Sequence, residues 1–110
     1  MGTKNALGYP VCVGNKRRFK AIDGKHVFVT IEDEIVRPQG SGPHSKLIYL
    51  QKLRFEEDNH IEYRFTYYMA GFKEGRTKGQ WVFGQYSLVV PAEDLQWLLR
   101  KARAKKWKGF

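Results

Sequence analysis

The sequence predicts an α+β protein in which an antiparallel meander of four to five strands is followed by one C-terminal amphipathic helix. Three observations lead to this fold class. Apolar and polar residues alternate over several segments between residues 16 and 90, as strands with one buried face require. Short polar or glycine-rich turns separate these segments. Apolar residues at helical spacing follow only after Pro91.

Residues 1–15 hold three glycines and one proline without a clear hydrophobic period. We expect a flexible arm there, with one short strand at residues 11–13. The dipeptide Asp23-Gly24 is a hairpin signal between strands at residues 17–22 and 26–35. The first structural unit of the domain is therefore a hairpin whose strands carry many basic residues.

Prolines and glycines between residues 37 and 45 predict a loop that joins this hairpin to the rest of the sheet. Beyond the loop, the clearest alternation in the chain places Tyr63, Phe65 and Tyr67 on one face of a strand. The predicted strands of this part cover residues 46–56, 61–72 and 80–90, with turns at residues 57–60 and 73–79.

The last element is a helix that begins at Pro91, because proline suits the first turn of a helix. Leu95, Leu98, Leu99 and Ala102 fall on one face, and this apolar stripe must be buried against the sheet. We expect one domain at residues 16–106 and a basic tail at residues 107–110, since 110 residues are too few for two cores.

The single cysteine excludes an internal disulfide and a cysteine-rich zinc site. Its apolar neighbours predict that Cys12 is a small buried residue. There is no apolar run of the roughly 20 residues that cross a bilayer and no signal-peptide pattern, so a reduced, cytoplasmic location is expected. We expect no membrane contact, no cofactor, no metal and no catalytic residue.

Twenty Lys and Arg residues against eleven Asp and Glu residues give a net charge of +9. Such an excess favours a polyanionic partner. If Tyr63, Phe65 and Tyr67 pack on the helix, Arg64 and Tyr68 face the other way. The same face is then expected to hold Trp81, Phe83, Lys52 and Arg54. A face of aromatic and basic side chains is typical of proteins that bind single-stranded nucleic acid.

The sequence therefore predicts non-catalytic binding of single-stranded DNA or RNA. The residues expected to bind it are Lys16, Arg17, Arg18, Lys20, Arg64, Tyr68, Lys73, Arg76, Lys78, Trp81, Phe83, Arg100 and Lys101, the last two within a basic run at residues 100–108. Two alternatives stay open at this point. The same aromatic face could be buried under the N-terminal arm, in a homodimer or against an acidic protein. The chain could also be a metal-dependent nuclease.

The nuclease alternative depends on the row of acidic residues at 32–34. Because successive side chains of a strand point to opposite faces, only Glu32 and Glu34 are expected to share a face. Their potential partners are Glu56, Asp58 and Glu62. The three histidines are scattered without metal-ligand spacing, and we expect His26, His44 and His60 to be surface or turn residues.

The order of four strands and a helix, with a basic glycine loop before the last strand, resembles two groups of proteins. One is the positive-cofactor-4-like transcriptional coactivators, and the other is the Pur-alpha and Whirly proteins. The similarity covers residues 46–105 and is carried by residues 75–79, 86–91 and 95–99, although the segment at 80–90 is longer than the coactivators have. It implies binding of single strands on a curved sheet, with phosphate contacts from Lys73, Arg76 and Lys78, and often a dimer.

Overall fold

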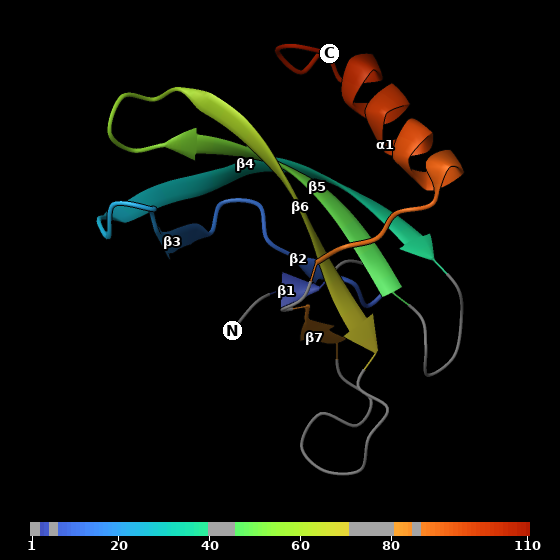
Figure 1. Ribbon diagram of the computed structural model, residues 1–110. Helices are drawn as coiled ribbons and strands as arrows, with labels where there is room; N and C mark the ends of the chain where they lie inside the picture. Colours follow the sequence, from blue (N-terminus) through green and yellow to red (C-terminus); the bar gives the residue numbers. More distant parts are fainter. Residues whose placement is uncertain (1–2, 5–6, 40–45, 71–80, 85–86) are drawn as a thin grey trace, which may run out of the picture.

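The computed structural model describes residues 3–4, 7–39, 46–70, 81–84 and 87–110, and it confirms the predicted fold class. A sheet of five antiparallel strands curls into a half-barrel and is followed by a single helix (Figure 1). Its strands lie in sequence order, as a meander requires. They are β3 (Lys16–Lys20), β4 (His26–Gln39), β5 (Lys46–Phe55), β6 (Ile61–Ala70) and β7 (Trp81–Phe83).

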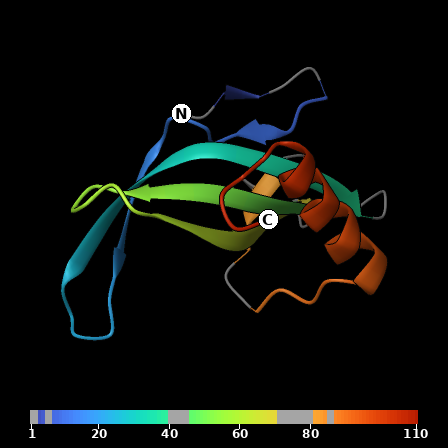
Figure 2. The same ribbon diagram turned by 90° about the horizontal axis from the view of Figure 1, so that it is seen from above.

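The helix α1 (Ala92–Ala104) and a small N-terminal sheet lie on opposite faces of this half-barrel (Figures 1 and 2). The small sheet pairs β1 (Thr3–Lys4) with β2 (Pro10–Val11). We call the side covered by α1 the convex face and the side that carries β1 and β2 the concave face. In the described part of the chain, no helix is long and apolar enough to cross a membrane.

The convex face is buried by the apolar stripe of the helix, as the sequence predicts. Leu98 and Ala102 of α1 are fully buried and pack on Ile35, Ile48 and Leu50 of the central strands. Burial of each large aliphatic side chain stabilises the fold by about 1.5–3 kcal/mol. This layer therefore holds the helix on the sheet.

The C-terminal residues fold back onto the same layer. The helix ends in a Schellman motif, with Lys106 in the left-handed region (φ 58°) and the Trp107 N–H donating to the Ala102 carbonyl at 3.1 Å. Trp107 is consequently buried, stacks on Tyr63 with ring centroids 5.6 Å apart, and donates from Nε1 to Asp33 at 3.0 Å. Trp107, which the sequence places in a basic tail at residues 107–110, thus belongs to the core.

An ion pair fixes the other end of the helix. Asp94, in the first turn, is buried and accepts hydrogen bonds from Arg37 Nε at 3.0 Å and from Gln39 Nε2 at 3.3 Å. A carboxylate at this position also interacts favourably with the positive end of the helix dipole. The helix begins at Ala92, one residue later than predicted, and Pro91 immediately precedes it.

A second apolar cluster lies on the concave face. Val29, Ile31 and Leu53 are buried there against Cys12, which confirms Cys12 as a small buried residue. The hydroxyl of Tyr49 donates to the Pro10 carbonyl at 2.6 Å. This hydrogen bond holds β2 on the inside of the half-barrel.

The strands predicted at 11–13 and 17–22 are observed as β2 and β3, each ending two residues earlier than predicted. Two other predicted boundaries are wrong by more than two residues. The predicted loop at 37–45 begins too early, because β4 continues to Gln39. Beyond Ile31 this strand pairs only with β5, and such an edge tolerates Pro38. The predicted strand at 80–90 stops as β7 at Phe83. The chain leaves the sheet at Gly84, where a Cβ atom would overlap the ring of Tyr67, and it then packs Leu88 and Val90 near the helix.

Candidate nucleic-acid interface

The strand register brings several predicted site residues together on the concave face. Tyr68 of β6 pairs with Phe83 of β7, and Ala70 pairs with Trp81, so Tyr68, Phe83 and Trp81 share a face. Arg64 lies on that face too, because its β5 partner is Gln51 and not Leu50. The expectation that Arg64 and Tyr68 face away from the helix is therefore confirmed.

A chain of polar side chains holds Arg64 in place. Its Nε donates to Gln51 Oε1 at 2.8 Å, and Gln51 Nε2 donates to Glu34 Oε1 at 3.0 Å. The other oxygen of Glu34 accepts from the backbone N–H of Cys12 at 2.9 Å. Gln51 is fully buried, so these hydrogen bonds fix the Arg64 side chain without placing an acid directly against it.

Arg64 has a second cation as its neighbour. Burial, and then the charge of Arg17, hold the pKa of the Arg64 guanidinium below its ordinary value. In the part of the chain that the structure describes, neither arginine forms an ion pair with an acidic side chain. Two close, half-buried cations repel each other. A bound anion would remove this repulsion.

Aromatic rings lie beside these cations, at different degrees of exposure. Phe83 is 45% exposed and meets Tyr68 edge-on at 5.5 Å. Tyr68 is half-buried, with its hydroxyl 3.4 Å from Cys12 Sγ, and burial together with this hydrogen bond raises its pKa to about 12. Trp81 is half-buried and meets the ring of Tyr9 at 6.0 Å. Phe83 is therefore the most accessible of the three predicted stacking residues.

Two pockets border Arg64. The first, of about 300 Å³, lies where β6 extends past the short β7, and both Arg64 and Phe83 line it. The second, of about 350 Å³, lies between β3 and β6, and Phe19, 38% exposed, lines it with Arg64 and with one acid, Glu62. Phe19 was missed in the sequence analysis. Its alternation with Arg17 along β3 was the signal that could have found it.

The basic run on β3 does not act as one patch. Arg17 faces the concave side, where it pairs across the strands with the buried Val29. Its neighbours Lys16, Arg18 and Lys20 alternate with it and point to the opposite face. Lys16 also forms an ion pair with Glu56 at 3.2 Å. Of this predicted cluster, only Arg17 joins Arg64.

Other predicted basic residues lie elsewhere. Arg100 and Lys101 are exposed on α1, on the convex side, and Lys101 lies 5.2 Å from the Trp97 ring. The placement of Lys52 and Arg54 on the aromatic face is wrong, because they pair with Tyr63 and Ile61 on the convex face and bind Glu32. Lys73, Arg76 and Lys78 lie outside the described residues.

The acidic row at 32–34 is divided between the two faces. A register shift between Ile31 and Asp33 marks a bulge, and the extra residue reverses the alternation. Glu32 therefore contacts convex cations while Glu34 binds Gln51 on the concave side, so the expectation that they share a face is wrong. Across the described ranges, no group of three His, Cys, Asp or Glu side chains could hold a metal ion.

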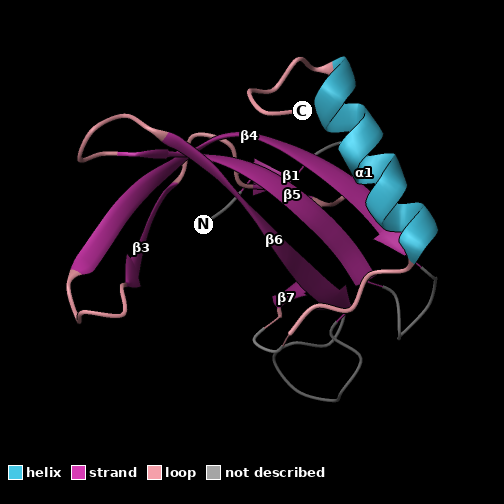
Figure 3. Cartoon of the chain, turned by 45° about the horizontal axis from the view of Figure 1, so that its top comes forward, coloured by secondary structure: helices cyan, strands magenta, loops and turns pink. Residues whose placement is uncertain are grey.

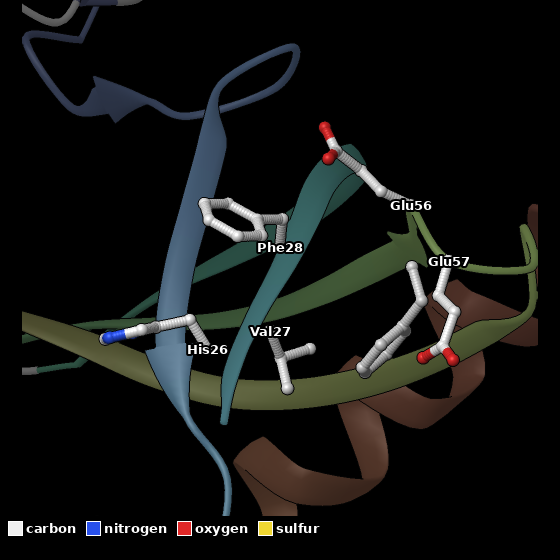
Figure 4. A pocket seen from close by; sticks show the side chains of 6 residues that line it. His26, Val27, Phe28, Glu56 and Glu57 are labelled. Atoms are coloured by element: carbon white, nitrogen blue, oxygen red, sulfur yellow. The ribbon is translucent and has the colours of Figure 1, made fainter. Parts of the chain in front are cut away.

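Two further features lie at the far end of the sheet. His60 contacts Asp58 and Glu62 in the exposed turn after β5 and stacks on Phe55 at 4.2 Å. A pocket of about 340 Å³ is lined by His26 and Phe28 of β4, and by Glu56 and Glu57 of the same turn (Figure 4). Its two carboxylates make this pocket a poor phosphate site.

Comparison of the chain with protein-family models, with curated proteins and with solved structures finds no match. The geometry of the concave face is thus the basis for a function.

Proposed function

We propose that this protein binds single-stranded nucleic acid without catalysis, on the concave face of the half-barrel. The observation that carries the proposal is that Arg64 borders two pockets, each with an accessible aromatic ring. Phe83 lines one pocket and Phe19 lines the other. Arg17 and Arg64 provide the charge between them.

This arrangement suits the two parts of a nucleotide. A base stacks on an aromatic ring, which contributes about 1–3 kcal/mol for each base. A phosphate accepts hydrogen bonds from guanidinium groups, which bind it in a planar, two-pronged geometry. Arg64 is already oriented by Gln51 and Glu34, so little side-chain entropy is lost when the ligand binds.

Single strands fit this face better than a duplex does. Bases of a single strand are free to stack on side chains, whereas those of a duplex are already stacked on each other. The resemblance to coactivators and to the Pur-alpha and Whirly proteins points to the same class of ligand. On this proposal the N-terminal segment borders the binding face, because Tyr9 contacts Trp81 and Cys12 contacts Tyr68.

The double variant Arg17→Gln/Arg64→Gln tests the proposal. Each phosphate contact to a single strand contributes about 0.7 to the slope of log K against log salt, so we expect this slope to fall by about 1.4. Fluorescence anisotropy with a labelled single-stranded DNA, at several salt concentrations, measures it. Gln at position 64 retains a donor for Gln51, which preserves the buried polar chain.

The matched control is Arg103→Ala/Lys108→Ala, which removes two exposed charges near the helix end. A fall in slope with the control but not with the arginine variant would contradict the proposal. So would the absence of salt-sensitive binding to any single strand. If no single strand binds and the wild-type chain forms a concentration-dependent dimer by size exclusion that Phe83→Ala abolishes, the aromatic face is a protein interface.

A further inference from the structure

The β3–β4 hairpin projects from the body of the sheet as a two-stranded ribbon. β3 pairs with residues 26–30 of β4, whereas β5 joins β4 only from Val29 onward. Of the residues described in this hairpin, Val29 and Thr30 alone have strand partners on both sides. The part at residues 16–28, which we call the ribbon, therefore extends beyond the sheet, as Figures 2 and 3 show.

A well-ordered turn presents an apolar side chain at the end of the ribbon. The Ala21 N–H donates to the Lys25 carbonyl at 2.8 Å, and the Gly24 N–H donates to the Ala21 carbonyl at 2.9 Å. Asp23 Oδ1 accepts from the Lys25 N–H at 3.0 Å, and Gly24 adopts a φ of 86° that favours glycine. Ile22 lies in this turn and is completely exposed.

The ribbon is also strongly basic. It carries five Lys or Arg residues and a single acid, Asp23, whose side chain is used within the turn. Arg18 lies across from Phe28, and Lys20 lies across from His26, all of them exposed. The ribbon thus combines an apolar end with cations on β3 and in the turn.

We propose that the ribbon enters the major groove of a nucleic-acid duplex next to the single strand held on the concave face. This inference rests on the proposed function, and it identifies the ligand as a junction between a duplex and a single strand. A two-stranded ribbon fits a major groove about 12 Å wide. There Ile22 would meet base edges, such as thymine methyl groups, while Lys20 and Lys25 reach the phosphates.

The position of Arg17 connects the two surfaces. It belongs to β3 at the base of the ribbon, and its charge acts on Arg64 of the concave face. A polyanion bound at these arginines is therefore continuous with the ribbon. A membrane surface is the less suitable partner, because one isoleucine among several cations offers little apolar area for insertion.

The experiment compares three labelled DNA probes: a single strand, a blunt duplex and a duplex with a single-stranded tail. The wild-type chain is expected to bind the tailed duplex most tightly. Lys20→Ala/Lys25→Ala should lower the salt slope on the tailed duplex by about 1.8, at about 0.9 for each contact. Ile22→Ser should weaken binding of that probe by about tenfold, the loss expected for one buried aliphatic contact.

Binding of the single strand should stay unchanged in these ribbon variants, since their side chains are exposed in or next to the turn at the end of the ribbon and line neither of the Arg64 pockets. Arg103→Ala/Lys108→Ala is again the control for removal of two charges. Far-ultraviolet circular dichroism confirms the fold of each variant.

The outcomes separate the two proposals. If the single strand binds through Arg17 and Arg64 but the ribbon variants bind the tailed duplex like wild type, the ribbon inference is wrong and the proposed function stands. If no single strand binds, the proposed function fails, and with it the junction. Loss of binding to phosphatidylserine vesicles in the ribbon variants, with duplex binding unchanged, overturns the inference in favour of a membrane partner.

Discussion

The two faces of the half-barrel use their positive charge differently. On the convex face the half-buried cations and the exposed Lys105 are paired with acids, and these ion pairs attach the helix or join neighbouring strands. On the concave face Arg17 and Arg64 form no ion pair with a described residue, and an amide holds Arg64. The convex pairs are Arg37 with Asp94, Lys52 and Arg54 with Glu32, and Lys105 with Asp33.

The difference teaches that net charge alone does not locate a polyanion site. Adjacent residues of one strand, Gln51 and Lys52, serve opposite purposes, since Gln51 orients an arginine and Lys52 neutralises Glu32. On the convex face Glu32 and Asp94 compensate the half-buried cations, and α1 covers the central apolar residues Ile35, Ile48 and Leu50. The concave face keeps charge and an exposed Phe83 available for a ligand.

Removal of Trp107 should have the largest effect and tests whether the convex face is purely structural. We expect Trp107→Ala to lower the free energy of unfolding by about 3–5 kcal/mol, because a buried ring and its contacts with Tyr63 and Asp33 are lost. Urea unfolding measures this loss, with Lys108→Ala as the exposed control. A loss no larger than the control's would show that the C-terminal residues do not belong to the core.

Two phenylalanines of similar exposure offer the sharpest test of the comparison. Phe83 is 45% exposed on the concave face, and Phe110 is 37% exposed beside Tyr63 on the convex face. We expect Phe83→Ala to weaken binding of single-stranded DNA by about 1–3 kcal/mol, while Phe110→Ala leaves it unchanged. Anisotropy titrations at one salt concentration give both values. Equal losses would mean that the faces are not functionally different.

The smallest effect concerns pH. Burial by itself would raise the pKa of the Asp33 carboxyl, but hydrogen bonds from Lys105 and Trp107 outweigh it and hold this pKa below the ordinary value of 3.8. The resulting stabilisation is present above that value and is lost as the pH falls through the lower, folded-state pKa. Asp33→Asn should therefore be destabilised relative to wild type at neutral pH, and the difference should fade in acid.

Urea midpoints over a range of pH measure this convergence, with Glu57→Gln as the exposed control. A difference that is constant from neutral to acidic pH would show that the charge of Asp33 does not hold the C-terminal residues.

The same alternation rule succeeded on β6 and failed on β4. It placed Arg64 and Tyr68 correctly because β6 pairs with β5 without a register shift. On β4 the bulge before Asp33 places Glu32 and Glu34 on opposite faces. No residue type in this segment indicates that a bulge is present. The alternation correctly predicts that Lys52 and Arg54 share a face. Only their pairing with Tyr63 and Ile61 of β6 shows that this face is the convex one.

Local sequence also could not indicate which rings stay accessible. Phe83 is accessible. Trp81 is partly covered because Tyr9, which is distant in sequence, contacts its ring. Likewise, Trp107 stood in a basic run that suggested a tail. Its burial depends on a Schellman turn that directs the ring onto Tyr63 and Asp33.

The sequence by itself determined the meander, the amphipathic helix, the positive charge and the division of β6 into two faces. Each of these features follows from composition or from the local period of apolar residues. These properties belong to a single strand or helix and do not depend on how it packs against other segments. Only the tertiary structure decided that the charge of Arg17 acts on Arg64, that Phe19 joins the concave face and that the β3–β4 ribbon extends past the last residue pair of β4 and β5. These features depend on strand register and on the curl of the sheet, which arise when distant segments pack together.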